Sequence, residues 1–308
     1  MRHVISAKQF KDINMLDEVL DLAEHMEKSV KNGTLGKPLQ GKVLASLFYE
    51  PSTRTRLSFE SAMVQLGGRV IGTESAGHFS SVTKGETLND TIKIIGGYSD
   101  VVVLRHSQEG SAKLASFVSP VPLINAGDGP GQHPTQALLD MYTIKKEFGR
   151  LNNLKVAFVG DLMYGRTVHS LAYLLAQRRG NMFYFVSPED IRMRQDFIKH
   201  LKDWQVPFVE TVDLNECISD VDVLYVTRIQ KERFRSVEEY EKFKGCYVVD
   251  KEVASKMKEG SRVMHPLPRV NELKEEVDSD PKAAYFRQAQ NGLYVRMALL
   301  KMLVNGEF

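Results

Sequence analysis

The chain of 308 residues contains only two cysteines, Cys217 and Cys246, which lie far apart in the sequence. Neither belongs to a paired metal-ligand spacing, which argues against a disulfide framework and a zinc site. The 41 basic and 39 acidic residues leave a formal charge of +2, so no electrostatic case exists for nucleic acid or an anionic membrane as partner. No apolar run approaches the ~20 residues of a membrane span, and no signal-type apolar core follows residues 1–5. We therefore expect a cytoplasmic protein with reduced thiols.

The length and the order of apolar segments predict two α/β domains, because 308 residues exceed what one core usually serves. Short apolar strands alternate with amphipathic helices, which is typical of parallel sheets covered on both faces. We predict strands at residues 42–49, 69–72, 101–104, 121–125, 154–159, 182–186, 208–210, 221–226, 247–249 and 262–264. We predict helices at residues 14–31, 53–66, 87–98, 111–117, 134–148, 165–178, 189–201 and 285–303, the last interrupted by Asn291 and Gly292.

The stretch from Glu50 to Glu60 joins a predicted strand to a predicted helix and carries hydroxyl groups and two arginines. At a helix N-terminus the first backbone N–H groups lack intrahelical partners, and the macrodipole favours an anion. Ser52, Thr53 and Thr55 add hydroxyl donors, and the planar fork of Arg54 suits a phosphate. The stretch therefore predicts a phosphate cradle. The alternative is that Ser52 merely caps the helix while Arg54 and Arg56 lie in solvent.

The stretch Gly160 to Thr167 nearly fits the nucleotide-binding pattern G-x-x-x-x-G-K-[ST]. It departs from the pattern because Arg166 replaces the phosphate-binding lysine and Asp161 places a negative charge in the loop. No convincing strand ends in a magnesium-binding aspartate. We interpret the stretch as a strand-to-helix turn that presents Arg166, not as an NTPase loop.

Polar residues follow several of the predicted strands, and in open parallel sheets ligands bind beyond the carboxyl ends of strands. We therefore expect these loops to converge on one cleft. The polar groups are Arg105-His106, His133 to Gln136, Thr227 to Gln230 and His265 to Arg269. The predicted helix 134–148 follows the densest turn-forming stretch, and we place the hinge between the domains in it.

Over essentially its whole length the chain resembles the catalytic chains of the aspartate carbamoyltransferase family. The blocks that carry the resemblance are residues 48–56, 84–87, 105–106, 132–136, 165–170, 227–233 and 265–269. The resemblance implies two doubly wound domains, each a parallel β-sheet flanked by helices, with the active site in the cleft between them. It assigns residues 1–133 to carbamoyl phosphate, with a C-terminal helix of about 285–308 packing back onto them, and residues 134–284 to aspartate.

The implied reaction transfers a carbamoyl group from carbamoyl phosphate to the amine of L-aspartate, an early step of de novo pyrimidine biosynthesis, without a cofactor or a metal. The resemblance assigns the catalytic groups and the carbonyl-binding groups to Thr55, Arg105 and His133, with Arg54 stabilising the leaving phosphate. The phosphate-binding set is Ser52, Thr53, Arg54 and Thr55. The carbamoyl amide is assigned to Gln136 and to the backbone carbonyls of Pro266 and Leu267.

The aspartate carboxylates are assigned by the same resemblance to Arg166, Arg228 and Lys84, with a hydrogen bond from Gln230. Lys84 and Ser80 lie in the family on a loop that reaches into the neighbouring subunit, which implies a homotrimer with shared sites. Glu50 matches a residue that bridges the domains through Arg166 and Arg233 on closure. His106, His169 and His265 are interpreted as structural, and the loop 228–244 resembles chains that assemble with separate regulatory chains.

Two alternatives remain open from the sequence. Ornithine carbamoyltransferases share the cradle, but in them a cysteine replaces the residue matched by Pro266, and here Arg228 and Gln230 favour a dicarboxylate acceptor. The other alternative is a non-catalytic relative that binds carbamoyl phosphate. One departure is Thr83, where some relatives have a second lysine.

Overall fold

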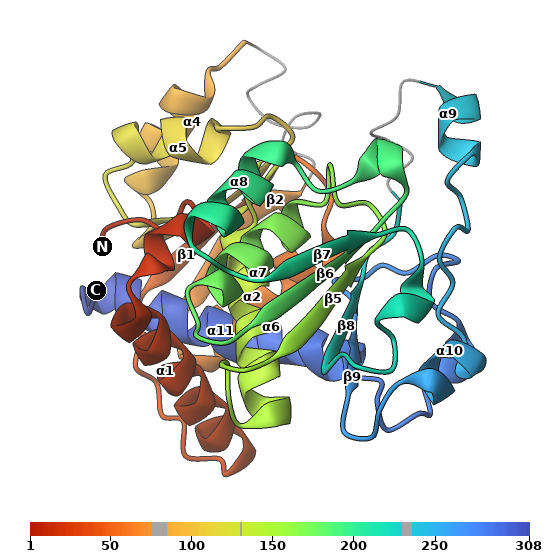
Figure 1. Cartoon of the computed structure of the whole chain (residues 1–308). Coiled ribbons are helices and arrows are strands. Elements are labelled where there is room, and N and C mark those ends of the chain that lie inside the picture. The colour runs from red at the N-terminus through yellow and green to blue at the C-terminus, as the bar shows by residue number, and fades with distance from the viewer. Residues whose placement is uncertain (75–84, 130, 230–235) are drawn as a thin grey trace. The chain divides into compact units, whose positions relative to one another are not determined.

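The computed structural model of the chain describes residues 1–74, 85–129, 131–229 and 236–308 (Figure 1). The chain divides into two compact units, one of Met1–Tyr142 with Gln290–Phe308 and one of Thr143–Ala289. Two helices, α6 (Pro134–Phe148) and α11 (Tyr285–Asn305), contribute residues to both units. No helix within these described ranges is long and apolar enough to cross a bilayer.

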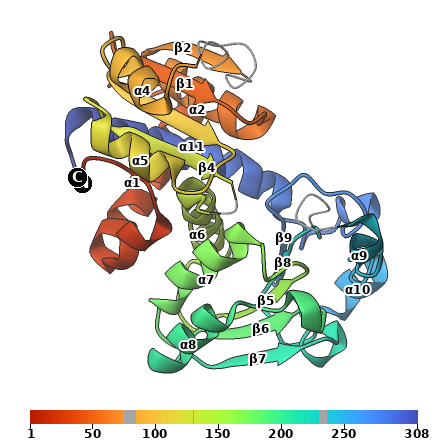
Figure 2. The same cartoon turned by 90° about the horizontal axis from the view of Figure 1, so that it is seen from above.

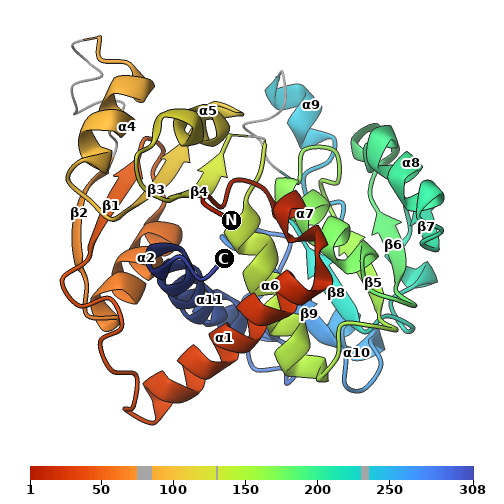
Figure 3. The same ribbon diagram turned by 90° about the vertical axis from the view of Figure 1, so that its left-hand side faces the viewer.

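The first unit contains a parallel sheet of four strands in the order β2-β1-β3-β4. Helices α4 and α5 cover one face of this sheet, and α2 with the end of α11 covers the other (Figure 3). The strand order reverses between β1 and β3, so the carboxyl ends of these two strands flank the switch point, where ligands bind in open α/β sheets. The strands are β1 (Val43–Phe48), β2 (Arg69–Glu74), β3 (Val101–His106) and β4 (Leu123–Asp128). The helices are η1 (Ala7–Lys11), α1 (Ile13–Lys31), α2 (Thr53–Gln65), α4 (Leu88–Gly96) and α5 (Ser111–Val118).

The second unit contains a parallel sheet of five strands in the order β7-β6-β5-β8-β9, whose switch point lies between β5 and β8. Helices α7 and α8 lie on one side of this sheet and α10 on the other (Figure 2). The strands are β5 (Lys155–Val159), β6 (Met182–Val186), β7 (Phe208–Thr211), β8 (Val223–Val226) and β9 (Arg262–Met264). The helices are α7 (Arg166–Ala176), η3 (Glu189–Ile191), α8 (Gln195–Asp203), η4 (Leu214–Glu216), α9 (Val237–Glu241), α10 (Lys251–Lys256) and η6 (Glu275–Val277). The predicted α/β class with doubly wound parallel sheets is therefore confirmed.

The inner strands β1, β5 and β8 are largely apolar and buried because helices cover both of their faces, whereas the edge strands β2 and β7 are more exposed. In β5, Ala157 and Val159 belong to a core cluster that includes Ala254 and Met257 around α10. The intervening Phe158 packs its ring against Tyr225 at a centroid distance of 5.8 Å. The period-two alternation of a strand thus fills two cores from one segment.

Three predicted elements differ from the structure. The predicted helix 189–201 is split into η3 and α8, because Arg192 and Arg194 have extended backbone angles. The predicted strand 247–249 is wrong, since only Val249 forms a single bridge, with Leu273. The predicted interruption at Asn291-Gly292 is also wrong, because α11 is continuous from Tyr285 to Asn305.

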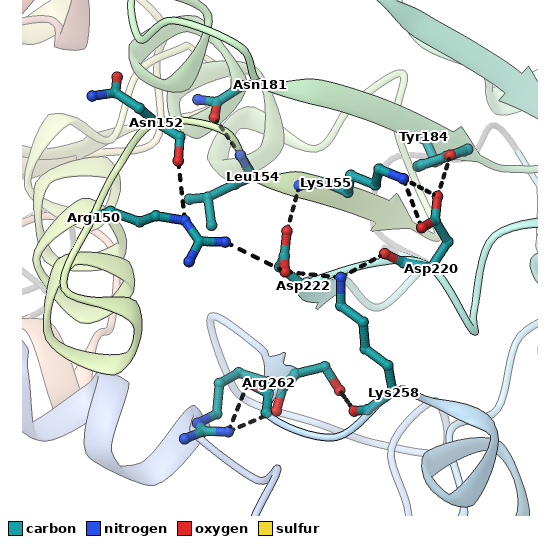
Figure 4. Close-up of polar contacts among 12 residues, drawn as sticks. Arg150, Asn152, Leu154, Lys155, Asn181, Tyr184, Asp220, Asp222, Lys258 and Arg262 are labelled. Carbon is teal, nitrogen blue, oxygen red and sulfur yellow. Dashed lines mark hydrogen bonds and ion pairs between the residues drawn. The ribbon is translucent and has the colours of Figure 1, made fainter.

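A polar cluster lies at the amino ends of β5 and β8, at the opposite end of the strands from their carboxyl ends (Figure 4). The Asp222 carboxylate accepts a hydrogen bond from the Lys155 backbone N–H at 2.8 Å and pairs with Lys258 Nζ at 2.9 Å. Its side chain is only 13% exposed. Asp220, in contrast, pairs with Lys155 Nζ at 2.7 Å on the exposed surface.

We expect Asp222→Ala to lower the free energy of unfolding by about 1–3 kcal/mol, because it leaves the Lys155 N–H without its acceptor and removes the carboxylate that pairs with Lys258. Asp220→Ala is the matched control and should cost ~1 kcal/mol or less, since exposed ion pairs are weak. Chemical denaturation measures both values. Equal losses in the two variants would contradict the structural role given to Asp222.

Candidate active site

The turn between β1 and α2 leaves a helix N-terminus open. Ser52 occupies the N-cap position, and its carbonyl accepts the Arg56 N–H at 3.1 Å, but its hydroxyl makes no capping hydrogen bond. Arg56 pairs with Glu60 at 2.8 Å and also with Glu74. The alternative in which Ser52 caps the helix and both arginines lie in solvent therefore does not describe this turn. Of the two arginines only Arg54 is exposed, and the Thr55 side chain is buried.

Arg105 lies near the carboxyl end of β3, on the other side of the switch point. Its guanidinium pairs with the Glu50 carboxylate at 3.0 Å and donates to the Ala126 carbonyl at 3.3 Å. Burial lowers the pKa of Arg105, an effect that Glu50 partly opposes. Burial and then the positive charge of Arg105 lower the pKa of Arg54. Two guanidinium groups of like charge beside a helix N-terminus favour a bound anion, which would relieve their repulsion.

His133 and Gln136 lie where the loop after β4 enters α6. Both side chains are buried, at 5% and 9% exposure. The Gln136 backbone N–H donates to the His133 carbonyl at 3.1 Å, and its side-chain Nε2 donates to Asp140 Oδ1 at 2.8 Å. The start of α6 and the residue before it therefore hold an oriented amide and an imidazole close together in sequence and in space.

The turn after β5 meets the loop after β8 at the switch point of the second sheet. Gly160 has a φ of +115°, and a Cβ there would lie 2.2 Å from the Thr227 carbonyl oxygen. Asp161 is buried, and its carboxylate accepts the Tyr164 N–H at 2.9 Å. The glycine therefore serves close packing of two loops, and the acidic residue shapes the turn, as the interpretation against an NTPase loop requires. Arg166 is the first residue of α7.

Arg228 lies on the wall of a pocket in the second unit. Gly160 and Thr227, whose loops pack closely, also line this pocket, as do Tyr240 and Lys244. Arg166, at the start of α7, and Arg228, in the loop after β8, thus lie on the two segments that follow the strands flanking this switch point, and their guanidinium groups suit carboxylates.

The segment after β9 contains a positioned histidine that we interpreted from the sequence only as structural. His265 is 1% exposed, and its Nδ1 accepts the Leu267 N–H at 2.8 Å. Its Nε2 must then carry the proton, and it donates to Glu272 Oε1 at 2.9 Å. Burial raises the pKa of Glu272, but the hydrogen bond from His265, the charge of His265 and hydrogen bonds from the backbone N–H groups together lower that pKa overall. Leu267 has a φ of +53°, so His265 holds a constrained backbone in place.

The other two histidines that the sequence analysis interpreted as structural also bind neighbouring groups. His106 accepts the Gln108 N–H at 3.0 Å, and His169 contacts the Leu162 carbonyl at 2.7 Å. Burial lowers the pKa of both imidazoles. The arrangement agrees with the structural role predicted for them.

The predicted site residues thus form two sets, one in each unit. The first unit holds Glu50, Ser52, Thr53, Arg54, Thr55, Arg105, His133 and Gln136, and the second holds Arg166, Arg228, Pro266 and Leu267. Ser80, Lys84, Gln230 and Arg233 lie outside the described residues. The predicted closure residue Glu50 pairs here with Arg105. The positioning histidine His265 could have been suspected from its place before two residues assigned to the carbamoyl amide.

Comparison with known proteins agrees with this arrangement. Residues 2–146 match the family described as aspartate/ornithine carbamoyltransferase, carbamoyl-P binding domain, and residues 152–303 match its Asp/Orn binding domain. The chain is 54% identical over 304 residues to a chloroplastic aspartate carbamoyltransferase of Arabidopsis thaliana, covering 98% of this chain and 78% of the relative. It is 53% identical over 306 residues to the aspartate carbamoyltransferase catalytic subunit of Methanocaldococcus jannaschii, covering 99% and 98%.

Solved structures give the same result. The catalytic subunit of M. jannaschii aspartate transcarbamoylase superposes with a TM-score of 0.93 at 52% identity, covering 99% of both chains. The Trypanosoma cruzi aspartate transcarbamoylase in complex with N-(phosphonacetyl)-L-aspartic acid superposes with a TM-score of 0.92 at 40% identity, covering 97% of this chain and 95% of that one. The chain belongs to the aspartate/ornithine carbamoyltransferase family, and within it to the aspartate carbamoyltransferases.

Proposed function

We propose that the chain transfers the carbamoyl group of carbamoyl phosphate to the amine of L-aspartate, giving N-carbamoyl-L-aspartate and phosphate, an early step of pyrimidine biosynthesis. The observation that carries the proposal is the pair of adjacent guanidinium groups, Arg54 and Arg105, beside the open N-terminus of α2. A dianionic phosphate ester fits this arrangement. The relatives named above support aspartate over ornithine as the acceptor.

The first unit supplies the groups for carbamoyl phosphate. The N–H groups and hydroxyls of Ser52, Thr53 and Thr55 bind its phosphate, and Arg54 stabilises the dianion as it leaves. When the neutral amine attacks the carbamoyl carbon, negative charge grows on the carbonyl oxygen. Donors from Thr55, Arg105 and His133 stabilise that charge. The amine itself forms the new bond, so no nucleophile of the protein is required.

The carbamoyl amide needs acceptors, because its NH₂ group can only donate. We assign this role to Gln136 and to the backbone carbonyls of Pro266 and Leu267. Since His265 accepts the Leu267 N–H at 2.8 Å, it fixes the backbone that presents these carbonyls. His265 is therefore a positioning residue.

Two substitutions separate the hydrogen bonds of His265. In His265→Asn the side-chain oxygen can still accept the Leu267 N–H, two residues further along the chain. In His265→Gln the longer side-chain amide can still donate to Glu272. We expect His265→Gln to raise the KM for carbamoyl phosphate by ~10–100-fold, because the backbone carbonyls of Pro266 and Leu267 would move away from the carbamoyl amide. His265→Asn should raise this KM much less. Steady-state kinetics together with the Tm of each variant measure this. If His265→Asn were as impaired in KM as His265→Gln, the Leu267 bond would not be the one that matters.

The second unit supplies Arg166 and Arg228 for the two carboxylates of aspartate, with Lys84 and Gln230 completing the set. Transfer requires the two substrates to be in contact, so we propose that the units close on them, with Glu50, Arg166 and Arg233 bridging in the closed state. We also propose a homotrimer in which Ser80 and Lys84 serve the neighbouring subunit, and the loop 228–244 as the segment relevant to separate regulatory chains. A cytoplasmic location stays a prediction, and the Arabidopsis thaliana relative is named chloroplastic.

The proposed sharing of sites predicts complementation between inactive chains. Lys84→Ala and Arg54→Ala chains are each expected to be nearly inactive, and mixing them in one trimer should restore a site that has both residues intact. Activity of mixed trimers, purified by differential tagging, measures this. Trimers verified to contain both chains yet without recovered turnover would argue against shared sites.

The proposed reaction is tested by phosphate release from carbamoyl phosphate by the purified chain, without added metal or nucleotide. We expect release that depends on L-aspartate. Binding of carbamoyl phosphate without release in the presence of aspartate or ornithine would favour the non-catalytic alternative.

A further inference from the structure

Gln136 can serve the carbamoyl NH₂ group in only one of its two amide orientations. A side-chain amide has an oxygen that accepts and an NH₂ that donates, so the oxygen must face the substrate. In the structure the other end of this amide is engaged, since Nε2 donates to Asp140 Oδ1 at 2.8 Å within the buried interior. The two residues lie four apart on α6, on the same face of the helix.

Asp140 lies beside a buried cation. Asp140 is fully buried and Arg296, from α11, is 4% exposed. Burial lowers the pKa of Arg296 to about 10, against the opposing attraction of Asp140, so Arg296 remains charged at neutral pH. Its guanidinium carbon also lies 5.1 Å from the ring centroid of Phe59 on α2. A carboxylate can only accept hydrogen bonds, which matches the direction of the bond from Gln136 Nε2 to Asp140 Oδ1.

Gly292 makes the position of Arg296 possible. A Cβ at residue 292 would lie 2.2 Å from Arg296 Nη1 and 3.1 Å from Leu139 Cδ2. The glycine that suggested a helix break in the sequence therefore lies within a continuous helix. Its missing side chain leaves the space that the Arg296 guanidinium occupies. Arg296 of α11 thus lies against Gly292 of its own helix and over the Phe59 ring of α2, and its charge is attracted by Asp140 of α6.

We propose that Asp140, buried near the charge of Arg296, is the positioning residue that fixes the Gln136 amide with its oxygen toward the substrate. This gives the site its preference for a carbamoyl group over an acetyl group. The inference rests on the function proposed above. A carbamoyl NH₂ donates to the oxygen, whereas a methyl group of the same shape leaves a buried acceptor unpaired. Sites that hydrogen-bond an NH reject analogues that lack it.

Two phosphonates that differ only in this group test the inference. Phosphonoacetamide carries NH₂ where acetonylphosphonate carries CH₃, and titration calorimetry gives a Kd for each. We expect the wild-type chain to prefer phosphonoacetamide by ~10–100-fold, the effect of one buried acceptor losing its donor. In Asp140→Asn the new amide can donate to Gln136, which can then turn its NH₂ toward the substrate. We expect the preference to fall to about threefold or less, with the Kd for acetonylphosphonate unchanged.

Asp140→Asn leaves Arg296 as a buried charge without its carboxylate and is expected to be unstable. A second variant, Asp140→Asn with Arg296→Met, removes that charge and keeps contact with Phe59 through a thioether. The matched control is Glu27→Gln, the same kind of exchange at the carboxylate that accepts the Tyr142 hydroxyl of α6 at 2.6 Å. Glu27→Gln should lower the Tm and keep the full preference for phosphonoacetamide.

Loss of the preference in the folded Asp140 variants, with the control unaffected, would support the inference. An intact preference in these variants would overturn it, and so would an equal loss in Glu27→Gln, which would reveal a merely structural effect. A wild-type chain without any preference would overturn it as well. Turnover with aspartate in the same preparation shows whether the proposed function survives that result.

Discussion

Arg54→Ala should reduce turnover with carbamoyl phosphate and aspartate by ~10²–10³-fold, because it removes the donor that stabilises the departing phosphate. The fold should be unaffected, since Arg54 is exposed and no hydrogen bond or ion pair joins it to another described residue. The measurements are kcat and KM for both substrates, with the Tm as a check on folding.

Arg56→Ala is the matched control on the same turn of α2. Arg56 pairs with Glu60 and Glu74, and it is not among the residues proposed to bind a substrate. Its removal should cost ~1 kcal/mol or less of stability and leave turnover within a few-fold of wild type. Near-normal turnover of Arg54→Ala, or an equal loss in Arg56→Ala, would remove Arg54 from its role.

Arg105→Met should lower turnover by a similar factor of ~10²–10³, for a different reason. Arg105 donates to the carbonyl oxygen as negative charge grows there, and it also balances Glu50 at 3.0 Å. The substitution therefore removes a catalytic donor and leaves a carboxylate without its partner. We expect the free energy of unfolding to fall by about 1–3 kcal/mol as well.

A second substitution separates these two effects. Arg105→Met with Glu50→Gln removes the stranded negative charge, so stability should largely return while turnover stays low. Denaturation and steady-state kinetics on both variants give the answer. Turnover that recovered together with stability would mean that Arg105 acts only through the fold.

Much of the fold could be predicted because parallel strands buried on both faces are apolar along their whole length. The wrong predictions of secondary structure arose where a single local feature of the sequence was used without the packing around it. Asn291-Gly292 suggests a helix break, but the buried guanidinium of Arg296 needs the space that a glycine leaves, and α11 continues through it. The segment 247–249 has strand composition, yet only Val249 finds a bridging partner.

The candidate site could be predicted where residue type carries the chemistry, as in the stretch from Ser52 to Thr55. His265 and Asp140 could not, because they act through other groups. His265 matters through the Leu267 N–H, and Asp140 through the orientation of the Gln136 amide. Such roles depend on which atoms meet after folding, and spacing along the chain does not reveal them.

The central claim is that this chain carbamoylates aspartate, and a competition between acceptors tests it most directly. Purified chain is given labelled carbamoyl phosphate with L-aspartate and L-ornithine together at equal concentration, and the labelled products are separated. We predict N-carbamoyl-L-aspartate with little or no citrulline, and the same product in the absence of any other chain. Citrulline as the main product would contradict the roles given to Arg166 and Arg228, and the absence of both products would contradict carbamoyl transfer by this chain.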